Sequence, residues 1–222
     1  MNYNRTNIIA SLATTPGISA ISIIRISGND LLPLIQQITG KENIKVRYAT
    51  YSTILSKNQK TVLDKCILIY YKGPYSYTGE DVVEINCHGG HIVSQSILNM
   101  LYSHGVQSAL PGEFSYRAFI NNKIDLIEAE AISSLIHSSS EYSNEIIIDH
   151  LNKSLTNQIL AINTEIINIL TIIEHELDFS EDEIDYTTNE SILEILDNIL
   201  VVVTGYLKNK KLVKTINNGV NV

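Results

Sequence analysis

The chain has 222 residues, 44% of them hydrophobic, and carries 16 Lys and Arg against 24 Asp and Glu, for a formal charge of −8. A chain of this length and composition can bury one large core or two small ones, so an intrinsically disordered protein is excluded. The acidic balance argues against diffuse nucleic-acid binding, which needs clustered Lys and Arg.

The first 120 residues predict a domain of strands and helices. Four stretches that alternate or are rich in β-branched residues predict strands, at 18–28, 48–55, 66–71 and 82–88. Helical spacing appears at 30–40 and 91–105, and Gly40 is suited to end the first of these helices. Strands that alternate with helices favour a mixed α and β domain, whose strand order the sequence does not reveal.

From about Asn121 the apolar spacing becomes helical. Asp125 is predicted to be a helix N-cap, with Glu128 as its capping-box partner. Apolar residues from Leu151 to Leu177 predict one long helix, and residues 192–212 predict another. Isolated helices gain most of their stability from packing, so this half is predicted to be part of a bundle. The fold class is therefore α+β, a mixed α/β domain followed by an incomplete all-α bundle.

The segment GEDVVEINCHGG, residues 79–90, is the most informative stretch for function. Read as a strand, it places its polar side chains on one face and its apolar side chains on the other. Glu84 then lies in mid-strand, where a half-buried carboxylate needs a donor, such as the paired N–H groups of an amino-pyrimidine edge. Glu80 and Asp81 are interpreted as turn residues that cap or solvate a loop. His88 and its glycines are interpreted as a strand exit that shapes a pocket.

Two cations are further candidates. Arg25 interrupts an apolar strand, so it is either paired with an acid or aimed at an anion. Lys123 is a second cation near a helix start, just before the proposed cap at Asp125. For both, a structural ion pair and a ligand contact remain open.

Other chemistries are disfavoured. There is no GxSxG and no GxxxxGK[ST], so we expect no catalytic residues and no nucleotide hydrolysis by the chain itself. Cys87, His88 and His91 lack a fourth ligand, and the acidic run 174–185 lacks the spacing of a calcium loop, so no metal site is expected. The two cysteines have no CxxC spacing, and neither a signal peptide nor a membrane span is evident, which favours a cytoplasmic protein without a membrane partner. The basic run 207–214 is more typical of a solvated helix end than of an RNA contact.

Four motifs, in register, closely resemble one family. They are ATTPGISAISIIRISG, GPYSYTGEDVVEINCHGG, LPGEFSYRAFINNKIDLIEAEAISSLI and LDFSEDEID, and they resemble the N-terminal part of the MnmE (TrmE) tRNA-modification GTPases. The resemblance implies a tetrahydrofolate-binding dimerisation domain at 1–120, similar to the folate domain of aminomethyltransferases. It further implies the first part of a helical domain at 121–216 and the start of a GTPase domain at 217–222.

The resemblance also implies the ligand and its contacts. The cofactor would be 5-formyl-tetrahydrofolate or a related one-carbon tetrahydrofolate, bound by Arg25, Glu84 and Lys123. Glu84 would hold the pterin ring by its donor edge, and the two cations would meet oxygen or carboxylate groups. GTP, Mg and K would belong to the GTPase domain, which we expect to be missing from this chain, either because it is a fragment or because the gene product is naturally truncated.

The expected function follows from the family. As a homodimer, and with the flavoprotein MnmG, the complete enzyme would add an aminomethyl-type group to C5 of the wobble uridine of tRNA. This chain would supply folate binding and dimerisation. One alternative is an assembly module without useful folate affinity. The other is an aminomethyltransferase-like enzyme that uses folate directly.

Overall fold

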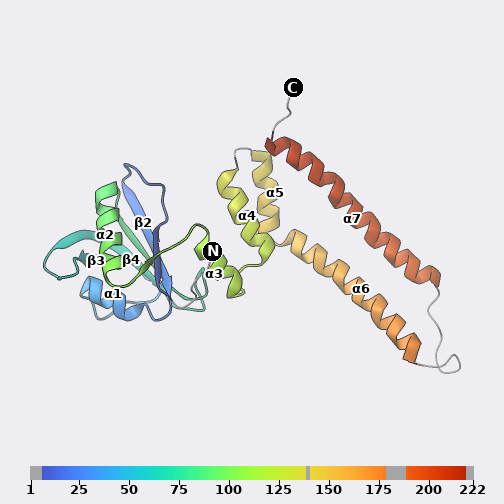
Figure 1. The fold of residues 1–222 in the computed structure, drawn as a ribbon, viewed down its shortest axis with the longest axis horizontal. Helices are drawn as coiled ribbons and strands as arrows, with labels where there is room; N and C mark the ends of the chain where they lie inside the picture. Colours follow the sequence, from blue (N-terminus) through green and yellow to red (C-terminus); the bar gives the residue numbers. More distant parts are fainter. Residues whose placement is uncertain (1–6, 139–140, 179–188, 219–222) are drawn as a thin grey trace. The chain divides into compact units, whose positions relative to one another are not determined.

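The computed structural model describes residues 7–138, 141–178 and 189–218, and the chain divides into two compact units, Met1–Asp125 and Leu126–Val222. The first unit is built on a six-stranded sheet with the strand order β3-β4-β5-β2-β1-β6, as Figure 1 shows in part. The strands are β1 (Ile9–Leu12), β2 (Ile21–Gly28), β3 (Thr50–Leu55), β4 (Val62–Tyr71), β5 (Asp81–His88) and β6 (Gln107–Ser108). Neighbouring strands are antiparallel except for β1 and β6.

The four predicted strands are present as β2 to β5, with shifted ends. β2 begins at Ile21 rather than at Ile18, whose side chain is fully exposed. β4 begins at Val62, four residues earlier than the pattern predicts, because it pairs with the end of β3 past an irregularity at Leu55. β1 and β6 have four and two residues, and strands so short show no readable alternation.

Helices α1 (Leu32–Thr39) and α2 (His91–Ser103) confirm the two helical predictions in the first unit. Gly40 ends α1 in the left-handed conformation, with φ 65°, and its N–H donates to the carbonyl of Gln36, as expected of a C-cap. Both helices pack on the sheet (Figure 1) and contribute to one core. Its fully buried members include Ile24, Ile26, Ile35, Leu68, Val83, Ile85, Ile97 and Leu101.

A third helix of this unit, α3 (Glu113–Ile120), was not predicted. It is only eight residues long, and Gly112 precedes it in the left-handed conformation, with φ 76°. α1 has the same length, but two of the three buried residues of α3, Glu113 and Arg117, are charged, so apolar spacing does not mark its buried face. Its position matters because the loop that follows it carries Lys123.

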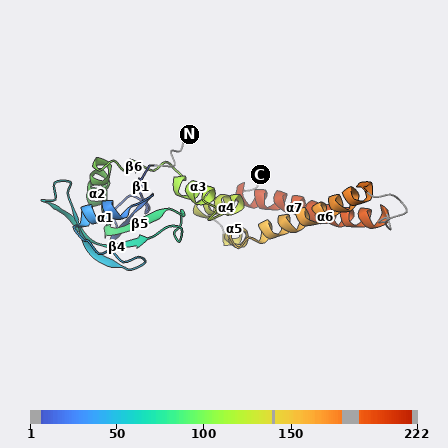
Figure 2. The same ribbon diagram turned by 90° about the horizontal axis from the view of Figure 1, so that it is seen from below.

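The second unit is all helical in its described residues. Its helices are α4 (Leu126–His137), α5 (Glu141–Leu151), α6 (Ser154–Asp178) and α7 (Asn189–Asn218). The predicted long helix over 151–177 is present as α6, but it begins at Ser154 rather than at Leu151, because Leu151 ends α5. Lys153, with φ 62°, then takes a left-handed conformation that interrupts the helix. In both views α6 and α7 run side by side in opposite directions (Figures 1 and 2).

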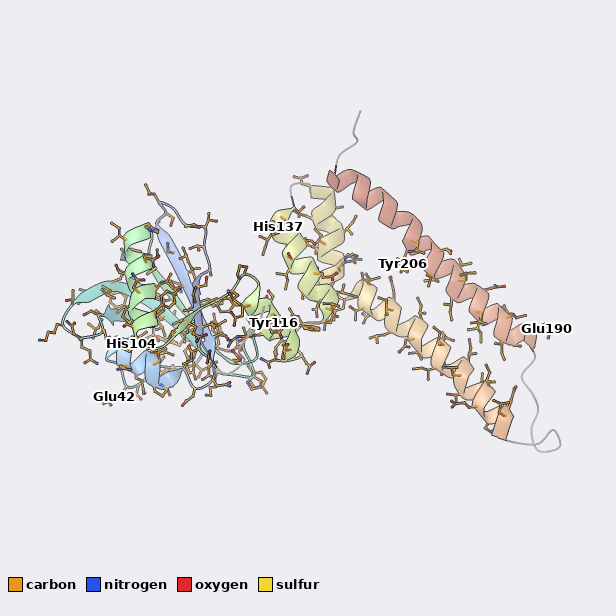
Figure 3. All side chains as sticks on the ribbon, in the orientation of Figure 1. Glu42, His104, Tyr116, His137, Glu190 and Tyr206 are labelled. Carbon is orange, nitrogen blue, oxygen red and sulfur yellow. The ribbon has the colours of Figure 1, made fainter. Side chains whose placement is uncertain are left out.

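The two long helices leave much apolar surface exposed. Tyr206 on α7, labelled in Figure 3, donates a hydrogen bond to the Gln158 side chain on α6. Exposed apolar residues on these helices include Leu160, Leu170, Leu177, Leu193, Leu200 and Val201. A helical face of this kind normally packs against another element, so the described residues contain only part of a bundle. No described helix combines the length and the apolar character that a membrane crossing would need.

Candidate functional site

Arg25 and Glu84 form a cross-strand ion pair. They lie directly opposite each other on β2 and β5. Period-two alternation puts both on the face of the sheet that points away from the core residues Ile24 and Ile85. Nε and Nη2 of Arg25 donate to the same oxygen, Oε1 of Glu84, at 3.0 and 2.8 Å. Of the two alternatives open for Arg25, the structure therefore shows pairing with an acid.

The pair leaves one carboxylate oxygen of Glu84 available. Among the described residues, Oε2 of Glu84 accepts no hydrogen bond, and the side chain is 20% exposed. A carboxylate can accept about four hydrogen bonds, so this oxygen can take a donor from a ligand. The Arg25 guanidinium is fixed by aromatic rings, with its carbon 5.4 Å from the ring centroid of Tyr77 and 5.8 Å from that of Phe114. The acceptor is thus presented in a fixed orientation.

A cavity of about 440 Å³ opens beside Glu84. Its size is in the range of small-molecule and cofactor sites. It is lined by Arg47, Tyr71, Tyr75, Ser76, Tyr77, Val82, Glu84 and Lys123. The structure therefore brings Glu84 and Lys123 to one cavity, while Arg25 reaches it only through its pairing with Glu84.

The position of Lys123 depends on close contact between two loops. After α3, the side-chain amide of Asn121 donates to the carbonyl of Thr78 at 2.6 Å, and the Lys123 N–H donates to the carbonyl of Ala118 at 2.8 Å. Gly79 lies against this loop with φ 79°, and a Cβ there would lie 3.0 Å from Cβ of Asn121 and 3.2 Å from Cγ of Lys123. A side chain at position 79 would therefore push the lysine away.

Asp81 is a buried hydrogen-bond acceptor, so its interpretation as a turn residue is wrong. It is the first residue of β5 and is 4% exposed. Its carboxylate accepts hydrogen bonds from the hydroxyl of Tyr70 at 2.8 Å, the ammonium of Lys72 at 3.0 Å and the N–H groups of Gly73 and Leu31. Burial alone would raise the pKa of Asp81, but the hydrogen bonds outweigh burial and the pKa is lowered.

Glu80 is also buried and structural, which the turn interpretation did not predict. Its Oε2 accepts hydrogen bonds from the Ser27 hydroxyl at 2.8 Å and from Nη1 of Arg117 at 2.9 Å. Nη2 of Arg117 binds Oε1 of Glu113 at 3.0 Å. Because Arg117 is 4% exposed, this is a buried acid–base–acid group, and it ties α3 to β2 and to the turn before β5. No local signal marks it, because the partners of Glu80 lie far away in the sequence.

Two protein-family models match this chain and together cover most of it. The family model described as "GTP-binding protein TrmE N-terminus" matches residues 8–123, more than half of the chain. The model described as "MnmE helical domain" matches residues 126–221. The chain belongs to the MnmE (TrmE) family. The resemblance inferred from four motifs is therefore confirmed, as is the α+β fold class.

Several MnmE relatives match only with part of their length. The tRNA modification GTPase MnmE of Sulfurovum sp. is 47% identical over 155 residues, which is 70% of this chain and 34% of the relative. The protein of the same name from Sulfurimonas denitrificans is 46% identical over 162 residues, 73% of this chain and 36% of the relative. That of Aquifex aeolicus is 36% identical over 215 residues, 96% of this chain and 48% of the relative. The chain spans about a third to a half of these MnmE proteins.

The remaining candidate residues lie apart from the cavity. The interpretation of His88 as shaping the pocket is wrong for this cavity, because His88 is exposed at the far end of β5 and its Nδ1 lies 2.7 Å from Oδ1 of Asp64. Cys87 is buried, and burial raises the pKa of its thiol to about 11. Within the described residues no group of three or more His, Cys, Asp or Glu could hold a metal ion. Much of the acidic run 174–185 lies outside them.

Proposed function

We propose that the first unit binds 5-formyl-tetrahydrofolate or a related one-carbon tetrahydrofolate in the cavity beside Glu84. The observation that carries this proposal is the arrangement of that carboxylate. Arg25 holds one oxygen, the other accepts no hydrogen bond among the described residues, and Glu84 lines a cavity with aromatic rings and a lysine. A pterin ring presents neighbouring N–H donors on one edge and flat faces for stacking, so it suits both features.

Each site residue then has a distinct task. Glu84 accepts hydrogen bonds from the donor edge of the pterin. Arg25 acts through Glu84, because both of its bonding nitrogens already face Oε1. Lys123 meets an oxygen or carboxylate of the ligand, since its ammonium has no acidic partner among the described residues and it lines the same cavity. None of the three is assigned a catalytic step.

The wider role follows from the family. In this proposal the chain dimerises through its first unit and works with the flavoprotein MnmG on tRNA, where folate supplies one carbon of an aminomethyl-type group at C5 of the wobble uridine. The relatives are named tRNA modification GTPases. The 222 residues contain no P-loop motif. We therefore assign GTP, Mg and K to a GTPase domain as found in complete family members, and we assign no catalytic residues here.

A second candidate is an assembly module without useful folate affinity. It is favoured by the same ion pair, because Glu84 and Arg25 already satisfy part of each other's charge without a ligand. A thermal melt separates the two candidates. A ligand that binds only the folded state stabilises it by about 2.7 kcal/mol at a hundredfold excess over Kd. This added stability raises the melting temperature. We expect 5-formyl-tetrahydrofolate to raise it, whereas a dimer by light scattering with an unchanged melting temperature would favour the assembly module.

A further inference from the structure

A second cation lines the cavity at a distance from Glu84. The N–H of Arg47 donates to the carbonyl of Tyr70 at 2.7 Å, and Val46 forms an isolated parallel bridge with the same residue. The segment therefore runs along β4 on the side away from β5. Glu84 on β5 lies opposite Ile69 of β4. The backbones of Glu84 and Arg47 therefore lie on opposite sides of β4. Two inter-strand spacings separate them, a distance of roughly 10 Å.

Arg47 is held in place by uncharged groups. Its backbone has φ 57°, a conformation that is uncommon for a residue with a side chain. Its guanidinium donates to the carbonyl of Tyr75 and lies 5.6 Å from the ring centroid of Tyr71. Such contacts orient a guanidinium and leave its charge in place. In the part of the chain that the structure describes, no acid pairs with Arg47.

The charges around the cavity therefore do not balance. Its one acid, Glu84, is paired with Arg25. Arg47 and Lys123 both line the cavity, and neither takes part in an ion pair among the described residues. Two uncompensated cations beside a neutral pair attract an anion. The part of the ligand that lies near them must carry negative charge.

We propose that Arg47 binds the carboxylates of the ligand's tail, so that the site prefers a folate whose tail carries several glutamates over one with a single glutamate. This inference rests on the proposed folate site and adds a specificity residue to it. With the pterin ring at Glu84, the aromatic side chains of Tyr75 and Tyr77 lie along the cavity, and the tail extends across the sheet toward Arg47. The planar guanidinium matches a carboxylate, and each added glutamate supplies another carboxylate within reach.

The test compares two ligands that differ only in the tail. The affinities of 5-formyl-tetrahydrofolate with one and with three glutamates are measured by calorimetry at low salt for the 222-residue chain. We expect the triglutamate to bind about three- to tenfold more tightly, the range for a partly exposed charge pair. In Arg47→Gln the ratio of the two affinities should fall to about one. Arg47→Lys should keep part of the preference, because it keeps the charge.

Lys45→Gln is the matched control. Lys45 lies two residues away, carries the same charge and has its ammonium 5.6 Å from the ring centroid of Tyr48, and it does not line the cavity. It should keep the triglutamate preference, and raised salt should weaken that preference in both this variant and the unmodified chain. A preference that survives Arg47→Gln, or equal affinities in the unmodified chain, would overturn the tail assignment alone. If neither folate binds the unmodified chain, the proposed function fails and the tail assignment with it.

Discussion

Asp81 shows how a buried carboxylate can organise a strand end. It joins the start of β5 to the N–H of Leu31 before α1 and to the hydroxyl of Tyr70 on β4. Every donor stabilises the ionised form, so the pKa of Asp81 in the folded protein lies below its ordinary value of 3.8. The resulting stabilisation is complete above that ordinary value and is lost as the pH falls through the lowered pKa.

We expect Asp81→Asn to lower the free energy of unfolding at pH 7 by about 1 to 3 kcal/mol, because several buried donors lose a charged acceptor. The loss should shrink as the pH falls below the ordinary value of 3.8 and through the lowered pKa, where the unmodified carboxylate becomes protonated. Urea unfolding followed by circular dichroism across this range measures both effects. Glu42→Gln changes an exposed carboxylate and is the control. A pH-independent difference between Asp81→Asn and the unmodified chain would contradict the assignment.

The two thiols should be inert in the folded protein. Cys66 and Cys87 are both buried, and burial raises the pKa of the first to about 12 and of the second to about 11. Since the thiolate is the reactive form, Ellman's reagent at pH 8 should find no fast-reacting thiol in the native chain and two in urea. Rapid reaction of either cysteine before unfolding would show that β4 and β5 open more easily than this core allows.

The face of a strand on which a residue lies could be predicted from local alternation in the sequence. The polar face of β5 could be predicted because period two places Glu84 opposite the apolar face that carries Val83 and Ile85. The burial of Glu80 and Asp81 could not be predicted in this way, because their donors come from β2, β4, α3 and the loops next to α1 and β4. Propensity places acids near a glycine in turns, and only the fold shows that these two are buried among donors.

At the scale of elements, the site depends on how closely the loop after α3 approaches the turn before β5. Gly79→Ala should weaken binding of 5-formyl-tetrahydrofolate several-fold, because a Cβ there meets Asn121 and Lys123. It should also cost about 1 kcal/mol of stability from its positive φ. Calorimetry measures the first effect and thermal unfolding the second.

Gly105→Ala is the matched control for that variant. Gly105 has a similar φ of 88°, and a Cβ there would meet nothing within 4 Å. It should lose stability without losing ligand affinity. If Gly79→Ala and Gly105→Ala bind the ligand equally well, the placement of Lys123 does not depend on the glycine.

Elements were predictable where their buried positions are apolar and regularly spaced. The strands from β2 to β5 and the helices α1 and α2 show several periods each, and all were predicted within a few residues. β1 and β6 are too short for a period to appear. α3 is as long as α1, but two of its three buried residues, Glu113 and Arg117, are charged, so apolar spacing does not mark its buried face. The end of α5 at Leu151 was not visible because the apolar spacing continues through the break, and a lysine at position 153 does not signal a left-handed conformation.

At the scale of the whole molecule, family membership came from the order of four motifs rather than from any one of them. Composition and periodicity alone predict an α+β protein with an incomplete bundle. They place Glu84 on the polar face of a strand, but they do not predict the cavity itself, because it is formed by Arg47, residues of β4 and β5, the turn between these strands and Lys123 together. The exposed apolar side chains of α6 and α7 agree with a chain that covers part of the length of its relatives.

The measurement that tests the central claim most directly is calorimetry of 5-formyl-tetrahydrofolate with the unmodified chain, Glu84→Gln and Glu42→Gln. Glu84→Gln removes the charged acceptor and keeps the shape. It should weaken binding by about 1.5 to 3 kcal/mol, the range for a hydrogen bond to a charged group, while Glu42→Gln binds like the unmodified chain. Equal affinities for all three proteins, with Glu84→Gln shown to be folded by its melting temperature, would contradict the assignment of Glu84 as the residue that holds the ring.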